Sequence, residues 1–244
     1  GNAVRGTVRQ PGQPALRGRS GHGLSVAGRQ LQDERRRLLL VGASGLVGRQ
    51  VLEQALADPR VAAVVAPSRR ALPDHPKLSS PHADYEQLDP DAPWWRADAV
   101  ICTLGTTMAT AGSQDAFRRV DHDYPLAVAR LAHDHGIPVY VLNSATGADA
   151  RSRFFYNRVK GALEDDLRQV GFQSLTLVRP GLIGGQREEF RLGERVMVAT
   201  LGVAGPLLPR RWRLNPASHI ARALLQAALE PKPGVHIVSS AQMA

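Results

Sequence analysis

Residues 38–66 read LLLVGASGLVGRQVLEQALADPRVAAVVA. The first four residues form a continuous apolar run, which is typical of a strand buried on both faces. A glycine-rich turn follows, and apolar residues then recur with a helical period from Val47 to Leu56. Asp58-Pro59 ends this helix, and residues 61–66 form a second apolar run. A strand, a turn, a helix and a strand within about 30 residues predict a βαβ unit.

The same alternation continues along the chain. Apolar runs predict strands at 98–103, 138–143, 174–178 and 235–238, and helical patterns occupy 113–135, 152–170 and 216–229. Gly136 and Gly171 close two of these helices, and Asn215 is the predicted cap of the last one. Strands that alternate with helices indicate a parallel sheet covered on both faces. We therefore predict a doubly wound α/β fold of three α/β/α layers, forming a single domain over residues 37–244 with a small substrate-side region near the C-terminus, at residues 187–209.

Residues 1–36 have a different composition, rich in Gly, Pro, Gln and Arg. Such a segment buries too little apolar area to offset its ordering entropy, so we expect a disordered basic tail. Eight of the 31 basic residues fall within residues 1–37, and the rest of the chain is close to neutral. The tail resembles an organelle transit peptide in charge, but its glycines and prolines oppose an amphipathic helix. A polyanion-binding arm is the alternative, although nucleic acid is not the expected partner.

Composition excludes several other classes. The chain has 244 residues, of which 43% are apolar and 22% charged, as in ordinary globular proteins. No apolar run reaches the ~18 residues that span a bilayer, so no membrane association is expected. The one cysteine, Cys102, excludes an internal disulfide framework and multi-cysteine zinc sites. We expect no metal site, and the reducing environment that suits a lone cysteine predicts a cytoplasmic location.

The turn at residues 42–48 has three glycines with the spacing GxxGxxG. A helix start offers unpaired N–H groups and a positive dipole end to a phosphate. Gly42 permits a tight turn, Gly45 lets a pyrophosphate approach the main chain, and Gly48 lets the helix pack closely on the sheet. A glycine turn without a ligand is the alternative. We predict that the contacts of a dinucleotide here are Gly42, Ser44, Gly45, Leu46, Val47 and Gly48.

The residues after the second strand bear on which dinucleotide binds. Sites for NAD(H) usually have an acid there for the ribose 2′-hydroxyl, but this chain has Arg69 and Arg70. A guanidinium holds a 2′-phosphate by charge-assisted hydrogen bonds. NADP(H) is therefore predicted over NAD(H). A solvated arginine loop is the alternative.

Tyr156 and Lys160 lie four residues apart on a predicted helix and so share one face. A neighbouring ammonium stabilises a phenolate and lowers the pKa of the tyrosine, which makes it a general acid or base. Ser144, at the end of the preceding strand, is placed to hydrogen-bond a substrate oxygen. Only three of the 31 basic residues are lysines, which makes a lysine at this position informative. We predict that Ser144, Tyr156 and Lys160 are catalytic.

These motifs together resemble the short-chain dehydrogenase/reductase superfamily, with its NAD(P)-binding Rossmann fold. The segments CTLGTT (102–107), VDHDY (120–124), GAD (147–149) and RPG (179–181) are closest to an atypical, epimerase/dehydratase-like branch that contains the Tat-interacting proteins and their bacterial relatives. The resemblance implies that Leu104, Gly105 and Thr106 line the cofactor and that Pro180 to Ile183 run along the nicotinamide. It places Asp121 where related enzymes often have an active-site Asn, and Thr146 is a rival to Ser144.

We accordingly predict an NADP(H)-dependent oxidoreductase that acts on a small-molecule carbonyl or alcohol. The alternative is an NADP(H)-binding regulatory or scaffold protein with little or no turnover. The superfamily resemblance also implies a homodimer, paired through the helices predicted at 113–135 and 152–170.

Overall fold

The computed structural model describes residues 1, 35–184 and 214–243. The predicted tail and the predicted substrate-side segment, 187–209, lie almost wholly outside these residues. The strands are β1 (Arg36–Val41), β2 (Val61–Val65), β3 (Leu78–Ser79), β4 (Ala99–Cys102), β5 (Val139–Asn143), β6 (Ser174–Arg179), β7 (Leu182–Gly184), β8 (Leu214–Pro216) and β9 (Gly234–Ser239). The α-helices are α2 (Leu46–Ala57), α3 (Met108–Ala111), α4 (Gln114–Arg118), α5 (Tyr124–Asp134), α6 (Phe155–Val170) and α8 (Ala217–Leu229).

A seven-stranded parallel sheet forms the centre of the domain, with the order β3-β2-β1-β4-β5-β6-β9. The chain starts in the middle at β1, builds outward to β3, and then crosses to β4 on the other side. This confirms the predicted doubly wound fold. In such sheets ligands bind outside the carboxyl ends of the strands, at the point where the strand order reverses. Here that point lies between β1 and β4.

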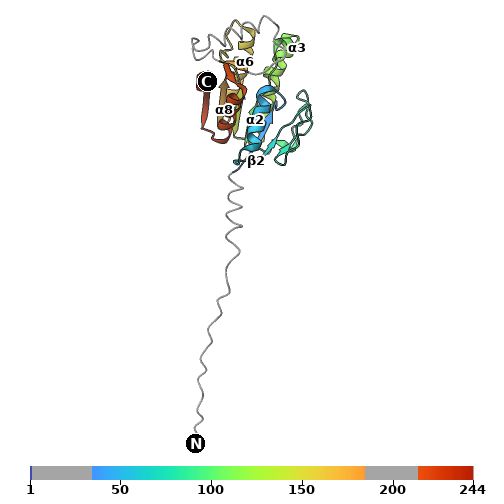
Figure 1. The fold of residues 1–244 in the computed structure, drawn as a ribbon, viewed down its shortest axis with the longest axis vertical. Coiled ribbons are helices and arrows are strands. Elements are labelled where there is room, and N and C mark those ends of the chain that lie inside the picture. Colours follow the sequence, from blue (N-terminus) through green and yellow to red (C-terminus); the bar gives the residue numbers. More distant parts are fainter. Residues whose placement is uncertain (2–34, 185–213, 244) are drawn as a thin grey trace. The chain divides into compact units, whose positions relative to one another are not determined.

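The two faces of the sheet bury separate apolar layers, because successive strand residues point to opposite faces. Leu38 and Leu40 pack with α2 and α8, which lie side by side on one face (Figure 1). Leu39 and Val41 pack with residues of α5 and α6 on the other. The continuous apolar run of β1 is thus explained by burial on both sides.

The helix predicted at 113–135 is interrupted. Ser113 caps α4, since its hydroxyl accepts the N–H of Ala116, and a five-residue π-helix, η2 (Arg119–Asp123), separates α4 from α5. Proline has no N–H to donate, so Pro125 removes one bond of the regular helical ladder at this point. The π turn joins α4 to α5, and residues of α5 then pack in the apolar layer on this face of the sheet.

The predicted cap of the last helix was wrong. Asn215 lies in β8, and α8 begins without a side-chain cap. The amide of Asn215 is fully buried, where it accepts hydrogen bonds from the N–H of Gly181 and the hydroxyl of Ser240. Tertiary hydrogen bonds have therefore outcompeted the local cap. Within the described ranges, we find no helix with the length and apolarity that a bilayer span needs.

Candidate functional site

The glycine turn connects β1 to α2 at the carboxyl edge of the sheet. Gly42 has a φ of 87°, and a Cβ there would lie 2.7 Å from the carbonyl carbon of Thr103. A Cβ on Gly48 would lie only 2.1 Å from the carbonyl oxygen of Gly42. Both positions therefore need glycine for the packing of the protein itself, as predicted.

Gly45 differs from the other two glycines because the space beside it is open. It is the N-cap of α2, with ordinary extended dihedral angles, and a Cβ there would meet only the oxygen of Gly42 at 3.4 Å. No side chain of the described residues caps α2, and its first turn carries no acid. The N–H groups of Leu46, Val47 and Gly48 occupy the first turn, where a helix lacks internal partners. This arrangement fits a pyrophosphate, which needs bare backbone and unpaired donors. Ser44 is half-buried, and its carbonyl oxygen accepts a bond from Arg49.

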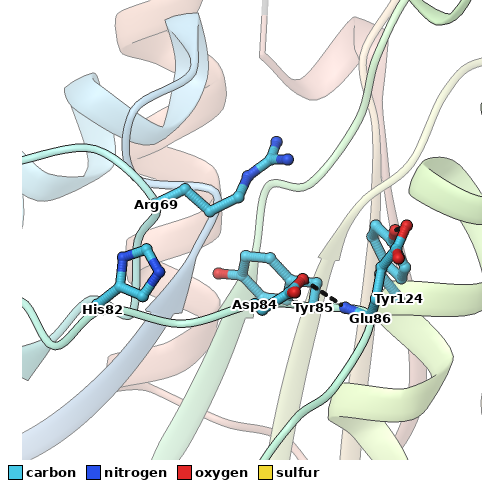
Figure 2. Close-up of a pocket in the computed structure, with 6 residues that line it drawn as sticks. All are labelled: Arg69, His82, Asp84, Tyr85, Glu86 and Tyr124. Atoms are coloured by element: carbon cyan, nitrogen blue, oxygen red, sulfur yellow. Dashed lines mark hydrogen bonds between the residues drawn. The ribbon is translucent and has the colours of Figure 1, made fainter.

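A cavity of about 310 Å³ opens beyond the end of β2. Figure 2 shows the side chain of Arg69 extending over it, with Tyr85 at its floor. The hydroxyl of Tyr85 is buried and donates to the carbonyl of Pro67 at 2.8 Å, and burial raises the pKa of this phenol. Arg70 is exposed beside it, and its N–H donates to the hydroxyl of Ser68. The cavity therefore lies beyond β2, the strand that pairs with β1 and hence next to the glycine turn.

Two acids also line this cavity, and sequence reasoning missed both. Asp84 accepts the N–H of Glu86 at 3.0 Å, and Glu86 accepts the hydroxyl of Tyr124 at 2.9 Å. They follow β3, a strand of two residues that is too short to be predicted from an apolar run. Since β3 pairs in parallel with β2, the residues after both strands meet at the same edge. A prediction of the third strand would therefore have placed Asp84 and Glu86 at this edge.

Tyr156 is in the first turn of α6, with 42% of its surface exposed. Its ring lies 5.7 Å from that of the buried Phe117. Lys160 follows one turn later but is only 4% exposed. The structure thus places the pair on one helix face, with the tyrosine at the surface and the lysine beneath it.

Lys160 forms a buried ion pair. Its Nζ lies 2.7 Å from Oδ1 of Asp121, whose side chain is 1% exposed. Burial lowers the pKa of Lys160, but the charge of Asp121 and that of a Tyr156 phenolate raise it, and the net direction is upward. The other oxygen of Asp121 accepts the N–H of Thr106 at 2.7 Å. The predicted cofactor-lining loop after β4 is therefore tied to the lysine.

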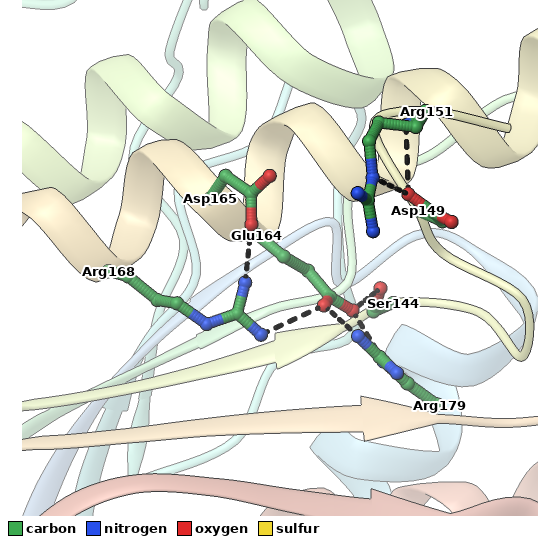
Figure 3. A network of polar contacts seen from close by, with 7 residues as sticks. All are labelled: Ser144, Asp149, Arg151, Glu164, Asp165, Arg168 and Arg179. Carbon is green, nitrogen blue, oxygen red and sulfur yellow. Dashed lines mark hydrogen bonds and ion pairs between the residues drawn. The ribbon is translucent and has the colours of Figure 1, made fainter.

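Ser144 is buried and donates its hydroxyl hydrogen to Oε1 of Glu164 at 2.6 Å. The guanidinium of Arg179 also binds this carboxylate, and Arg168 approaches it from the next turn of α6 (Figure 3). The hydrogen bond to Glu164 is the main cause that raises the pKa of Arg179. Glu164 thus joins the ends of β5 and β6 to α6.

The remaining predicted residues surround this edge of the sheet. Thr146 is half-buried, with its hydroxyl donating to the carbonyl of Arg179 at 3.0 Å and its N–H to that of Pro180 at 2.8 Å. Ile183 pairs with Asn215 in the small β7–β8 sheet. Leu104 is half-buried, and Gly105 is exposed above the ion pair, since a Cβ there would lie 3.3 Å from Oδ1 of Asp121. The turns after β1, β4, β5 and β6 therefore meet at one edge.

Comparisons with known proteins agree with this geometry. A family model described as NAD(P)H-binding matches residues 42–211. The structure of MoeE5 in complex with UDP-glucuronic acid and NAD aligns with a TM-score of 0.66 and 19% identity, covering 82% of this chain and 75% of that one. A putative NAD-dependent epimerase/dehydratase from Bacillus halodurans aligns with a TM-score of 0.58 and 17% identity, covering 85% and 97%. At these identities the two structures show the fold alone, a Rossmann-like α/β fold with a parallel sheet.

A curated relative bears on location. The protein named fmp52, mitochondrial, of Aspergillus clavatus is 38% identical over 208 residues, covering 80% of this chain and 88% of its own length. That name contradicts the predicted cytoplasmic location, so the prediction was wrong. A lone cysteine indicates a reducing environment but does not distinguish one reducing compartment from another.

Proposed function

Because the chain belongs to the NAD(P)H-binding family, with an NAD(P)-binding Rossmann domain, we propose that it is an NADP(H)-dependent oxidoreductase of a small-molecule carbonyl or alcohol. The observation that supports this most is the pairing of an exposed Tyr156 with a buried Lys160 at the edge where α2 begins. An ordinary surface pair would expose both side chains, and burial of an ammonium is costly unless it is paired, as Lys160 is with Asp121.

The chemistry assigned to the chain is proton transfer and orientation. A bound nicotinamide supplies or accepts the hydride. In the direction of reduction, the hydroxyl of Tyr156 donates a proton to the substrate oxygen, and it accepts one in the direction of oxidation. Lys160 stays protonated, in line with its raised pKa, and its charge favours the phenolate that remains.

A hydroxyl near the end of β5 orients the substrate oxygen. Ser144 can serve only by turning its hydrogen away from Glu164, which then keeps the bonds from Arg179. Thr146 is the alternative and lies nearer the surface. We assign this role to Ser144, with Thr146 as its rival.

The preference for NADP(H) rests on Arg69. Its guanidinium lies at the cavity, exposed to solvent and able to form two parallel bonds to a phosphate. Asp84 and Glu86 both oppose such an anion, but Asp84 already accepts the N–H of Glu86, and Glu86 accepts the hydroxyl of Tyr124 and lies 3.4 Å from Arg119. Arg69 is therefore the cation that a 2′-phosphate would meet.

Ligand-dependent melting tests the cofactor assignment. At 100 times its dissociation constant, a ligand stabilises the fold by about 2.7 kcal/mol, so we expect NADPH to raise Tm by several degrees more than equal NADH. Arg69→Ala should abolish the difference between the two, whereas Arg130→Ala, an exposed arginine of α5, should retain it. A difference that survives in Arg69→Ala would place phosphate recognition elsewhere.

The chemical assignment is tested with Tyr156→Phe. We expect this variant to bind NADPH with unchanged affinity and to lose turnover by about 10²-fold or more, the share that a positioned acid contributes. Equal turnover by the variant would refute the assignment. If the native protein binds NADPH but turns over no member of a broad carbonyl panel, the regulatory alternative replaces the enzyme.

A further inference from the structure

The ion pair beneath Tyr156 is held by three separate elements. Asp121 comes from the π turn η2, Lys160 from α6, and the N–H of Thr106 from the loop after β4. Both charged side chains are 5% exposed or less. Water therefore screens them little, and each charge acts strongly on its neighbours.

From the position of Tyr156, these two charges have opposite effects. An ammonium favours ionisation of a phenol, whereas a carboxylate disfavours it. Because the charged atoms of Asp121 and Lys160 are only 2.7 Å apart, the carboxylate opposes the field of the ammonium at a group one helical turn away. The third group facing Lys160 is Cys102 of β4, and burial raises the pKa of that thiol, which disfavours its charged form.

We propose that Asp121 is a positioning residue that cancels most of the Lys160 charge and thereby sets the pH at which Tyr156 exchanges its proton. The proposal deepens the proposed function, since it assumes that Tyr156 is the acid or base. It also gives Asp121 a second effect, because the same carboxylate orients the Thr106 loop at the cofactor side.

The test is a phenolate titration, followed by ultraviolet absorbance in the protein without cofactor. The chain has four tyrosines, and burial is the main cause that raises the pKa of each of the other three. Tyr156→Phe identifies the transition of interest by removing it. Since no turnover is involved, failure of the proposal is distinct from failure of the proposed function, which Tyr156→Phe reports through turnover.

Asp121→Asn keeps an acceptor for Thr106 but removes the negative charge. We expect the Tyr156 transition to move down by about 1 pH unit, because the phenolate then faces an unopposed ammonium. The negative charge of the phenolate in turn keeps Lys160 protonated. Asp115→Asn, at an exposed carboxylate of α4, should leave the transition unchanged. No downward movement in Asp121→Asn would overturn the proposal.

The double variant Asp121→Asn/Lys160→Met decides the matter even if the single variant fails to fold, because it leaves no unpaired buried charge. If the two charges cancel, removing both should leave the transition within about 0.5 pH unit of the native protein. A transition raised by more than this would show that Lys160 acts on Tyr156 unopposed, and the proposal would be wrong.

Discussion

Replacing Glu164 by glutamine tests whether the buried carboxylate holds the site together. Glu164 is 1% exposed and accepts bonds from Ser144, Arg179 and Arg168. Glutamine has nearly the same shape but no charge. Its NH₂ group is a hydrogen-bond donor, so it cannot accept the bonds that one of the carboxylate oxygens accepts. The variant therefore removes an electrostatic interaction while leaving the packing of α6 almost unchanged.

The magnitude follows from burial. Removing one partner of a fully buried ion pair lowers the free energy of unfolding by about 3–5 kcal/mol, because the other charge is left unpaired. The side chain of Arg179 is 26% exposed, so water recovers part of that loss. We therefore expect about 2–3 kcal/mol of destabilisation. For a domain of this size that is a fall in Tm of about 5–10 °C.

Thermal and urea unfolding, followed by circular dichroism, measure this effect. Glu53→Gln is the matched control, because Glu53 is exposed on α2, and it should change stability by less than about 0.5 kcal/mol. Ser144→Ala removes one of the donors and should cost about 1–2 kcal/mol in the native protein but less in the Glu164→Gln background. A Glu164→Gln variant that melts with the native protein would refute this account.

Two further predictions concern the glycine turn and alkaline stability. Gly48→Ala should destabilise the fold by about 1–3 kcal/mol, since its Cβ would lie 2.1 Å from a backbone oxygen. Gly45→Ala should keep the stability of the native protein but bind NADPH more weakly, because its Cβ meets only one atom of the protein. Melting of both variants with and without NADPH measures the two effects. Stability should also fall as pH rises above the ordinary pKa values of these side chains, which are 9.0 for Cys102, 10.0 for Tyr140 and 10.5 for Lys160. All three pKa values are raised in the fold, so above these values the unfolded chain releases protons that the native one keeps. Urea midpoints measured from pH 8 to 11 check this, and an unchanged midpoint would contradict it.

The strands and the cofactor turn were predictable because their signals are local. An apolar run buried on both faces, a glycine turn and a helical period are each readable within ten or so residues, and the observed β1 and α2 match them. Elements without a local signal were missed. Leu78-Ser79 is too short to show a pattern, and β7 and β8 exist only because they pair with each other.

The site itself was predicted as a set of residue types, but not as a network. Tyr156 and Lys160 share a helix face, which spacing alone predicts. Ser144 lies 20 residues from Glu164 in the chain, and nothing in that separation indicates a 2.6 Å hydrogen bond. Asp121 was noted only through its resemblance to an active-site position, and its contact with Lys160 spans two helical elements. Charges buried by tertiary packing are therefore the part of the site that pattern reading misses.

The π turn explains why the electrostatics of the site depend on the fold rather than on a loop. In a regular α-helix, successive residues point about 100° apart, so only one of Asp121 and His122 would face α6 squarely. In η2 both are buried, and they reach α6 six residues apart: Asp121 at Lys160 and His122 at Asp166, the latter at 2.9 Å. Pro125 makes such a turn inexpensive, because it has no N–H for the regular ladder. Because η2 itself packs on α6, the fold keeps the carboxylate of Asp121 beside the ammonium of Lys160.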